Sequence, residues 1–231
     1  VDPPLMAHRC CRAAGLNPIY SSMTVPGRLD QTFSKADVSE PLVLGTAGHP
    51  NKYLTAGGTP WTAWVVAALR DTDRRFVHIG PRHEGLDQAI TTALEAAGID
   101  ASRYDRIGTA PSVREALLAH GVQAYIGSAP QGGGLSALEA LSAAIPTLIP
   151  ADPERASLLG LLVPIPGWRE VSTPDELADG LGRISILHHE IRSPAFRALL
   201  KDELSRFELY VGGERLPDMT VPEAAPRFSP A

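Results

Sequence analysis

Short apolar segments alternate with amphipathic helical segments along residues 41–215. Each apolar segment is short and ends near a glycine or a turn, which is typical of a strand buried on both faces. The predicted strands are Pro41–Gly45, Arg75–Gly80, Tyr104–Ile107, Val122–Ile126 and Pro146–Ile149. Strands that alternate with helices form βαβ units, so we expect an α/β fold with a Rossmann-like parallel sheet flanked by helices.

Helix start signals precede the apolar stripes between these strands. Thr59 has the residue type of an N-cap, and Pro60 that of a first turn, ahead of a stripe that carries Trp61 and Trp64 toward the core. Ser112 and Glu115 have the spacing of a capping box. Further helices are expected along 86–97, from the glycine-rich segment to about Ala143, from Thr173 and from Ser193.

The composition changes at both ends of the alternating region. Residues 1–40 lack periodicity and contain several prolines, so they are interpreted as a linker or as a segment of a missing N-terminal domain. Residues 216–231 are rich in proline and are expected to be an irregular tail. The sequence begins with Val1, which favours a piece of a longer protein.

Charge and composition narrow the function classes. The chain has 231 residues and a net charge of 21 − 26 = −5, which argues against nucleic acid or an acidic membrane surface as a partner. The 2 cysteines are adjacent, so they predict neither a disulfide framework nor a metal site, and a cytoplasmic protein is expected. His188, His189 and Glu190 lack the spacing of a helical metal pair. No apolar segment approaches the roughly 18 residues of a membrane span.

A glycine-rich segment between a strand and a helix is the strongest chemical motif. It comprises Gln131, Gly132, Gly133, Gly134, Leu135 and Ser136. Glycines let the backbone approach a ligand, and a helix N-terminus presents free N–H groups to a phosphate. The segment is neither a G-x-G-x-x-G nor a Walker sequence, so neither a dinucleotide oxidoreductase nor a P-loop NTPase is supported. The alternative is a flexible turn.

Two charged side chains, Lys52 and Glu139, are candidates for contacts with a nucleotide bound at this glycine-rich segment. Lys52 follows the first strand and is placed to neutralise a departing diphosphate, although a solvated loop lysine is the alternative. His49, in the same loop, is a candidate phosphate donor. Glu139 is a candidate acceptor for a ribose diol, but with Ser136 it also matches a capping box, and spacing leaves both roles open. Arg82 and His83 either line the cleft or lie on the surface.

The segment from Gly132 to Leu148 resembles the donor-binding part of GT-B glycosyltransferases. These enzymes have two Rossmann-like domains, of which the C-terminal one binds the sugar nucleotide, and the resemblance covers residues 41–210. It implies a nucleoside diphosphate sugar as substrate, with UDP as the expected nucleotide, and no cofactor or metal. It also implies that the backbone around Gly108 lines the base.

The loop pattern within that superfamily is similar to the O-linked N-acetylglucosamine transferases and their asparagine-modifying relatives. Asn51 and Lys52 precede a helix with tryptophans and then a strand, and Lys52 matches the lysine that contacts the diphosphate in that group. Glu139 takes the place of a ribose-binding aspartate, and residues 134–136 take the place of a His-Thr-Thr turn, which is a departure. Against retaining transferases with Glu-x7-Glu, Glu139 matches the second glutamate, but Gln131 stands at the first.

The resemblance and the residues together predict the donor-binding domain of a glycosyltransferase. Lys52 is expected to be catalytic, and the donor is expected to contact His49, Asn51, Gly108, residues 131–136 and Glu139. The acceptor, whether protein, glycan or lipid-linked glycan, is expected on another domain. The alternatives are a sugar-nucleotide 2-epimerase and a non-catalytic nucleotide-sugar-binding module.

Overall fold

The computed structural model of the chain describes residues 41–54, 57–71, 74–130, 134–151, 166–194, 196 and 198. Its centre is a 6-stranded sheet with the order β3-β2-β1-β4-β5-β6. All neighbouring strands are parallel. The strands are β1 (Leu42–Ala47), β2 (Arg74–Ile79), β3 (Tyr104–Gly108), β4 (Ala124–Ile126), β5 (Thr147–Pro150) and β6 (Trp168–Val171). The predicted Rossmann-like parallel sheet flanked by helices is therefore confirmed.

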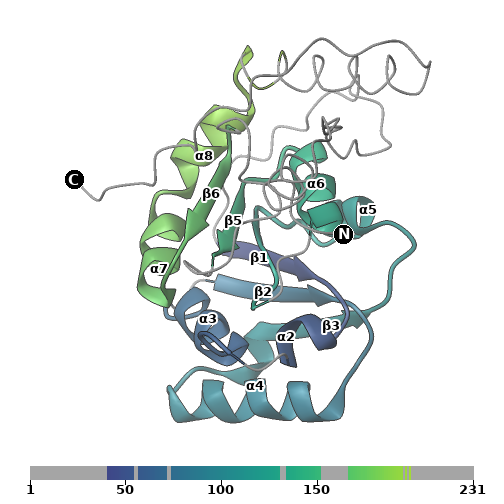
Figure 1. Cartoon of the computed structure of the whole chain (residues 1–231), viewed down its shortest axis with the longest axis vertical. Helices are drawn as coiled ribbons and strands as arrows, with labels where there is room; N and C mark the ends of the chain where they lie inside the picture. The colour runs from purple at the N-terminus through teal and green to yellow at the C-terminus, as the bar shows by residue number, and fades with distance from the viewer. Residues whose placement is uncertain are drawn as a thin grey trace, which may run out of the picture.

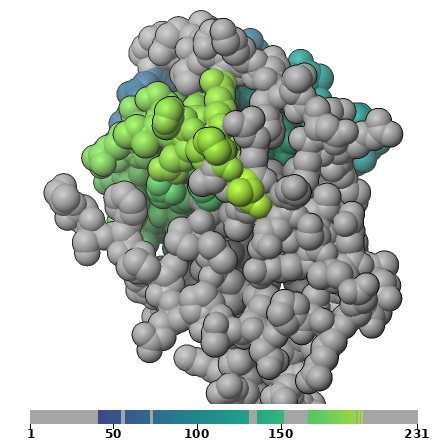
Figure 2. Space-filling view, turned by 90° about the horizontal axis from the view of Figure 1, so that it is seen from above, coloured from purple at the N-terminus to yellow at the C-terminus, as the bar shows by residue number. Residues whose placement is uncertain are grey.

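Helices cover both faces of this sheet (Figure 1). One face carries α3, α4 and α7, and the other carries α5 and α6. The helices are α2 (Asn51–Leu54), α3 (Trp61–Ala68), α4 (Glu84–Ala96), α5 (Val113–Ala119), α6 (Gly134–Ser142), α7 (Pro174–Gly182) and α8 (Ile184–Ile191), with a short 3-10 helix at Ala101–Arg103. On the space-filling surface, the green region of α7 and α8 forms one patch at the C-terminal end of the described chain (Figure 2).

Alternation along the strands divides the core between the two faces. Leu44 and Phe76 pack among the residues of α3, α4 and α7, whereas Val77 and Tyr125 pack on the side of α5 and α6. Because successive side chains of a strand point to opposite faces, a strand covered on both sides must be apolar at nearly every position. This requirement produced the short apolar segments from which the sheet was predicted.

The predicted cap at Ser112 and the predicted helix start at Thr173 are confirmed. The Ser112 hydroxyl accepts a hydrogen bond from the Glu115 N–H at 3.2 Å, and the Thr173 hydroxyl accepts one from Glu176 at 3.1 Å. The prediction that Thr59 caps α3 is wrong by one residue. The helix begins at Trp61, and the extended Pro60 is its N-cap without a side-chain hydrogen bond.

The sequence did not predict β6, α2 or the break between α7 and α8. β6 contains Arg169 and Glu170 in 4 residues, and α2 has only 4 residues, so neither shows a clear period. The predictions for residues 1–40 and 216–231, and for most of the helix from Ser193, lie outside the described residues. Within the described part of the chain, no helix combines the length and the hydropathy that crossing a membrane requires.

Candidate functional site

The strand order creates a switch point at the carboxyl ends of β1 and β4. β1 pairs with β2 on one side and with β4 on the other, so the chain leaves these two strands toward opposite faces. In open parallel sheets, ligands bind in the crevice at such a switch point. Two described segments border it: the loop 48–50 with α2 on the β1 side, and residues 127–130 with α6 on the β4 side.

Backbone hydrogen bonds join the ends of the first three strands in one row. The Gly48 N–H donates to the Ile79 carbonyl at 3.0 Å, and the Gly80 N–H donates to the Gly108 carbonyl at 2.7 Å. Gly80 has a φ of +150°, and a Cβ atom there would lie 2.2 Å from the Gly48 carbonyl oxygen. Any side chain at this position would therefore push the β1–α2 loop away from β2.

Lys52 extends from the short helix α2 beside this row. Its backbone N–H donates to the His49 carbonyl at 3.0 Å, and its side chain is half-buried. His49 and Asn51 are exposed, and the Asn51 N–H lies 3.4 Å from Nδ1 of His49. None of the ion pairs among the described residues includes Lys52. Its charge is therefore not neutralised by a carboxylate of this part of the chain.

A buried polar network lies beneath the loop, and sequence reasoning missed it. His78 is 0% exposed, and its Nδ1 lies 3.1 Å from Nη1 of Arg106 and is hydrogen-bonded to the Tyr104 hydroxyl. The Tyr53 hydroxyl lies 3.2 Å from Oγ1 of Thr46, and the Tyr53 ring centroid is 4.6 Å from that of His78. The network joins α2, which carries Lys52, to the first three strands.

Arg106 brings a positive charge into this network. Its Nη1 pairs with Oδ1 of Asp87 at 3.2 Å, and its Nη2 donates to the Pro81 carbonyl at 2.5 Å. The Arg106 carbonyl in turn accepts a hydrogen bond from Arg82 at 3.2 Å. A buried guanidinium is tolerated only with such partners, because desolvating a charge is expensive.

Burial shifts the pKa values of the network in the directions that favour the neutral forms of its side chains. Desolvation, and then the Arg106 charge, lower the pKa of His78 well below its ordinary value, so the imidazole is neutral at pH 7. Desolvation likewise raises the pKa of Tyr53 and of Tyr104. On the other face, burial raises the pKa of Tyr125 to about 12. These phenols therefore act as neutral hydrogen-bonding groups.

The β4 side of the switch point is built on α6. The Ser136 hydroxyl donates to the Ala47 carbonyl at 3.4 Å, which places the start of α6 beside the end of β1. The Tyr125 hydroxyl lies 3.3 Å from both the N–H and the carbonyl oxygen of Ala47. Lys52 and the first turn of α6 therefore lie on opposite sides of the switch point.

Glu139 has a partner that the sequence did not predict. Its Oε2 accepts a hydrogen bond from the Arg114 N–H at 2.9 Å, in the first turn of α5. The expected alternative, a capping box of Ser136 with Glu139, is wrong because α6 already begins at Gly134 and Ser136 lies within it. A carboxylate accepts up to about four hydrogen bonds, so this contact orients Glu139 without exhausting it.

Most of the predicted site residues that the structure describes lie at this sheet edge. His49, Asn51, Lys52 and Gly108 lie at the ends of β1 and β3, and Ser136 and Glu139 lie on α6. The structure describes only the backbone of Gly134 and Leu135, and Gln131, Gly132 and Gly133 lie outside the described residues.

Arg82 and His83, which the sequence left between cleft and surface, are both exposed. The His83 ring caps α4 by accepting the Leu86 N–H at 3.2 Å. His83 therefore has a structural role.

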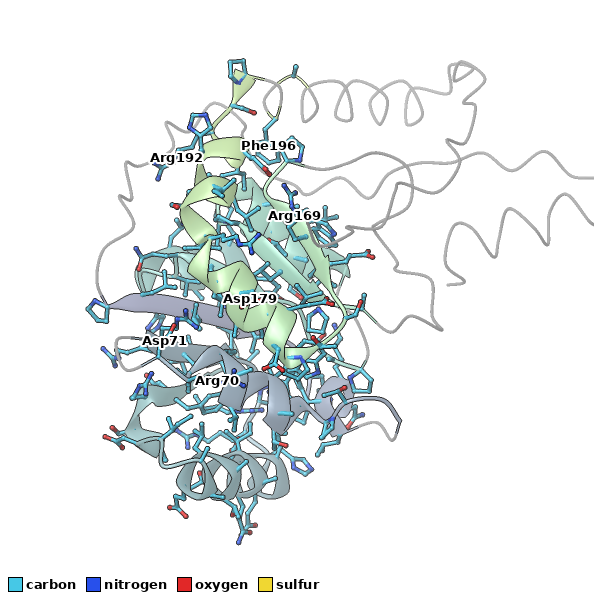
Figure 3. The ribbon with its side chains drawn as sticks, turned by 90° about the vertical axis from the view of Figure 1, so that its left-hand side faces the viewer. Arg70, Asp71, Arg169, Asp179, Arg192 and Phe196 are labelled. Carbon is cyan, nitrogen blue, oxygen red and sulfur yellow. The ribbon has the colours of Figure 1, made fainter. Side chains whose placement is uncertain are left out.

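A shallow hollow of about 430 Å³ lies at the opposite edge of the sheet. It is lined by Arg70, Asp71 and Asp179, whose side chains are labelled in Figure 3, and by Arg74 and Arg183. Arg70 follows the C-terminal end of α3, where a positive charge stabilises the helix dipole, and Arg183 is the junction between α7 and α8. Arg70 pairs with Asp175 at 3.0 Å, and Arg74 pairs with Asp71. Arg70 and Arg74 therefore have structural reasons for their positions.

No metal centre is visible among the described residues. No group of 3 or more His, Cys, Asp or Glu side chains in this part of the chain has the arrangement of a metal site. His188 is buried on α8, and neither ring nitrogen has a hydrogen-bond partner among the described residues.

Solved structures of glycosyltransferases share this fold. TarM of S. aureus has a TM-score of 0.55 at 16% identity, and it matches 89% of this chain but 41% of its own. The lipopolysaccharide outer core galactosyltransferase WaaB in its apo form has a TM-score of 0.53 at 17% identity, over 90% of this chain and 58% of its own. Pneumococcal O-GlcNAc transferase GtfA, solved with UDP and GlcNAc, has a TM-score of 0.53 at 18% identity, over 92% of this chain and 44% of its own.

These likenesses show the GT-B Rossmann-like fold, since the identities are too low to show more. No protein-family model matches the sequence, and no curated protein is significantly similar to it. The chain spans 41% to 58% of the length of these transferases.

Proposed function

We propose that the chain is the donor-binding domain of a glycosyltransferase and that it binds a nucleoside diphosphate sugar, with UDP as the nucleotide. The proposal rests on two positively charged groups at the switch point, which are the ammonium of Lys52 and the positive end of the α6 helix dipole. Lys52 and the N-terminal turn of α6 border it from the two sides. The transferases of the same fold support it, and both GtfA and a TarM mutant were solved in complexes that contain UDP.

The diphosphate would occupy the crevice between these two groups. A helix N-terminus presents free N–H groups and a positive partial charge to an anion, and the glycines 132–134 let the ligand approach the backbone. Lys52 would neutralise the charge that develops on the leaving diphosphate. The ammonium and the helix dipole thereby take the role that a metal ion has in other transferases.

The nucleoside would lie along the same edge. Glu139, oriented by the Arg114 N–H, would accept hydrogen bonds from the ribose diol, and the backbone at Gly108 would line the base. His49 and Asn51 are exposed near Lys52 and would contact the phosphate or the sugar. The acceptor, a protein, a glycan or a lipid-linked glycan, would be held by a second domain.

Titration of the chain with UDP tests this proposal. We expect weak binding, with nuclear magnetic resonance shifts at residues 48–52 and 127–139. Lys52→Ala should reduce the affinity, whereas Arg70→Ala, a matched loss of a cation at the opposite sheet edge, should not. Shifts elsewhere, or none at millimolar UDP, would contradict the proposal.

An assay of donor turnover in the protein that contains this domain separates the remaining alternatives. Hydrolysis or transfer of the sugar supports a transferase, and an isomerised donor supports a 2-epimerase. Binding without turnover supports a non-catalytic module.

A further inference from the structure

Tyr53 is the buried residue of α2 and comes directly after Lys52. Its hydroxyl is hydrogen-bonded at 3.2 Å to Oγ1 of Thr46, a fully buried residue of β1. Its ring centroid lies 4.7 Å from that of Trp61 on α3 and 4.6 Å from that of His78 on β2. A phenol whose ring is packed and whose hydroxyl is bonded has a defined position and orientation. One side chain therefore attaches α2 to three other elements of the fold.

Lys52 and Tyr53 both pack directly on the backbone of Gly48. A Cβ atom on Gly48 would lie 2.9 Å from the Tyr53 hydroxyl oxygen and 3.2 Å from Cδ of Lys52, and both distances are shorter than an ordinary van der Waals contact. Only a residue without a side chain permits this approach. Because Cδ is the third of the four methylene carbons of a lysine, most of the Lys52 side chain lies against Gly48.

Gly48 is itself fixed to the sheet. Its N–H donates to the Ile79 carbonyl at 3.0 Å, and its carbonyl oxygen lies against Gly80. The methylene carbons of Lys52 therefore rest on a part of the backbone that belongs to the β1–β2 ladder. Lysine has one of the largest rotamer entropies among the side chains, so a side chain that is ordered before binding reduces the cost of binding an anion.

We infer that Tyr53 is a positioning residue of the candidate site: its anchored phenol holds α2 against Gly48 and thereby orients the ammonium of Lys52 before the ligand binds. The inference rests on the proposed function for the role of Lys52, but the restraint of α2 by Tyr53 does not depend on that function. An apolar pair would avoid the desolvation of the two buried hydroxyls, whereas their hydrogen bond fixes one arrangement of the ring.

Removal of the hydroxyl bond from either end tests the restraint. Tyr53→Phe keeps the ring and deletes its hydroxyl, and Thr46→Val deletes the partner hydroxyl without changing α2. Tyr104→Phe is the matched control for the first variant, because it deletes a phenol hydroxyl of the same network that is bonded to β2 instead. Thr147→Val is the control for the second, because Thr147 is equally buried and its hydroxyl donates to a backbone carbonyl beside β5.

Hydrogen exchange of the Lys52, Tyr53 and Leu54 amides, which are bonded within the turn of α2, measures the restraint without any ligand. We expect Tyr53→Phe and Thr46→Val to accelerate this exchange about tenfold relative to their controls, because local opening of α2 becomes easier. Equal exchange in each variant and its control would overturn the inference. The same acceleration throughout β4 and β5 would also overturn it, since it would indicate a general loss of stability.

A double-mutant cycle measures whether Tyr53 acts through Lys52. Tyr53→Phe should weaken UDP binding about fivefold in the wild-type chain and less than about twofold in Lys52→Ala, because a positioning residue has no effect once the group that it positions is absent. Equal losses in the two backgrounds, or an unchanged UDP affinity in the wild-type background, would overturn the positioning role. If the wild-type chain binds no UDP, the proposed function fails, and the exchange comparison alone decides whether Tyr53 restrains α2.

Discussion

The two sides of the switch point support their polar side chains by different means. On the β1 side, Lys52 is carried by a helix of 4 residues whose buried Tyr53 is hydrogen-bonded to Thr46 and packs against the His78 ring. On the β4 side, Glu139 is carried by a helix of 9 residues whose Ala137, Ala140 and Leu141 are buried in the core. A short helix cannot bury enough apolar surface to fix itself, so it depends on specific polar contacts.

This difference predicts different responses to substitution. A buried polar network is costly to break, because each lost partner leaves a desolvated group unsatisfied. An apolar helix face tolerates the loss of one contact because the other contacts remain. A substitution on the β1 side should therefore shift the whole loop. The structural effect of a substitution on the β4 side should be confined to the substituted residue.

The largest effect is expected from Gly80→Ala. The new Cβ atom would meet the Gly48 carbonyl oxygen, at a φ that L residues avoid. Strain and overpacking together should lower the free energy of unfolding by more than about 3 kcal/mol. Gly98→Ala is the control, since its φ is also positive but no atom lies within 4 Å, and it should cost about 1 kcal/mol. Urea unfolding measures both, and equal losses would show that the close approach of Gly48 is unimportant.

Lys52→Ala should have the next largest effect, and it acts on the rate. If the ammonium meets charge that grows on the leaving diphosphate, its removal costs roughly 3 kcal/mol in the transition state, about a hundredfold in kcat, with a smaller change in donor binding. Steady-state kinetics of the transferase that contains this domain measures this effect. Unaltered kinetics would show that Lys52 is a solvated surface residue without a catalytic role.

Glu139 should show two separable functions. Glu139→Ala removes the acceptor for the Arg114 N–H at the start of α5 and should cost about 1 kcal/mol of stability, as the loss of a helix cap does. Glu139→Gln keeps an acceptor oxygen and should retain stability while raising the donor KM, because a ribose contact is the same in ground and transition states. Thermal melts run beside donor titrations separate the two effects. A normal donor KM in both variants would remove Glu139 from the ribose site.

The smallest expected effect is the pH dependence contributed by His78. Its pKa is lowered in the folded chain, so the unfolded chain binds the proton first as the pH falls through about 6.5. The contribution of the neutral His78 to the free energy of unfolding is thus fully present above that pH and is lost below it. Between pH 7 and pH 6 the loss is under about 1 kcal/mol. Denaturation midpoints of the wild type and of His78→Gln across this range measure it. Parallel curves would show that His78 is not held neutral.

The sheet could be predicted because its signal is local, whereas the polar network could not. Parallel strands buried on both faces require apolar segments, and each segment can be recognised by itself. His78 and Arg106 are far apart in the sequence and meet only through the register of β2 with β3, in which they are direct partners. The contact of Glu139 with the Arg114 N–H likewise depends on how α5 packs against α6.

The central position of β1 also has a consequence for the order of folding. β1 pairs with β2, the next strand in the chain, but its other edge pairs with β4, where Leu44 lies opposite Ala124. During synthesis, β1, β2 and β3 are complete while that second edge of β1 is still open. An open, apolar strand edge is a template for pairing with other chains. A nascent chain that stalls before Ala124 is therefore expected to be the species most prone to aggregation, and each later strand then closes the edge left by the one before it.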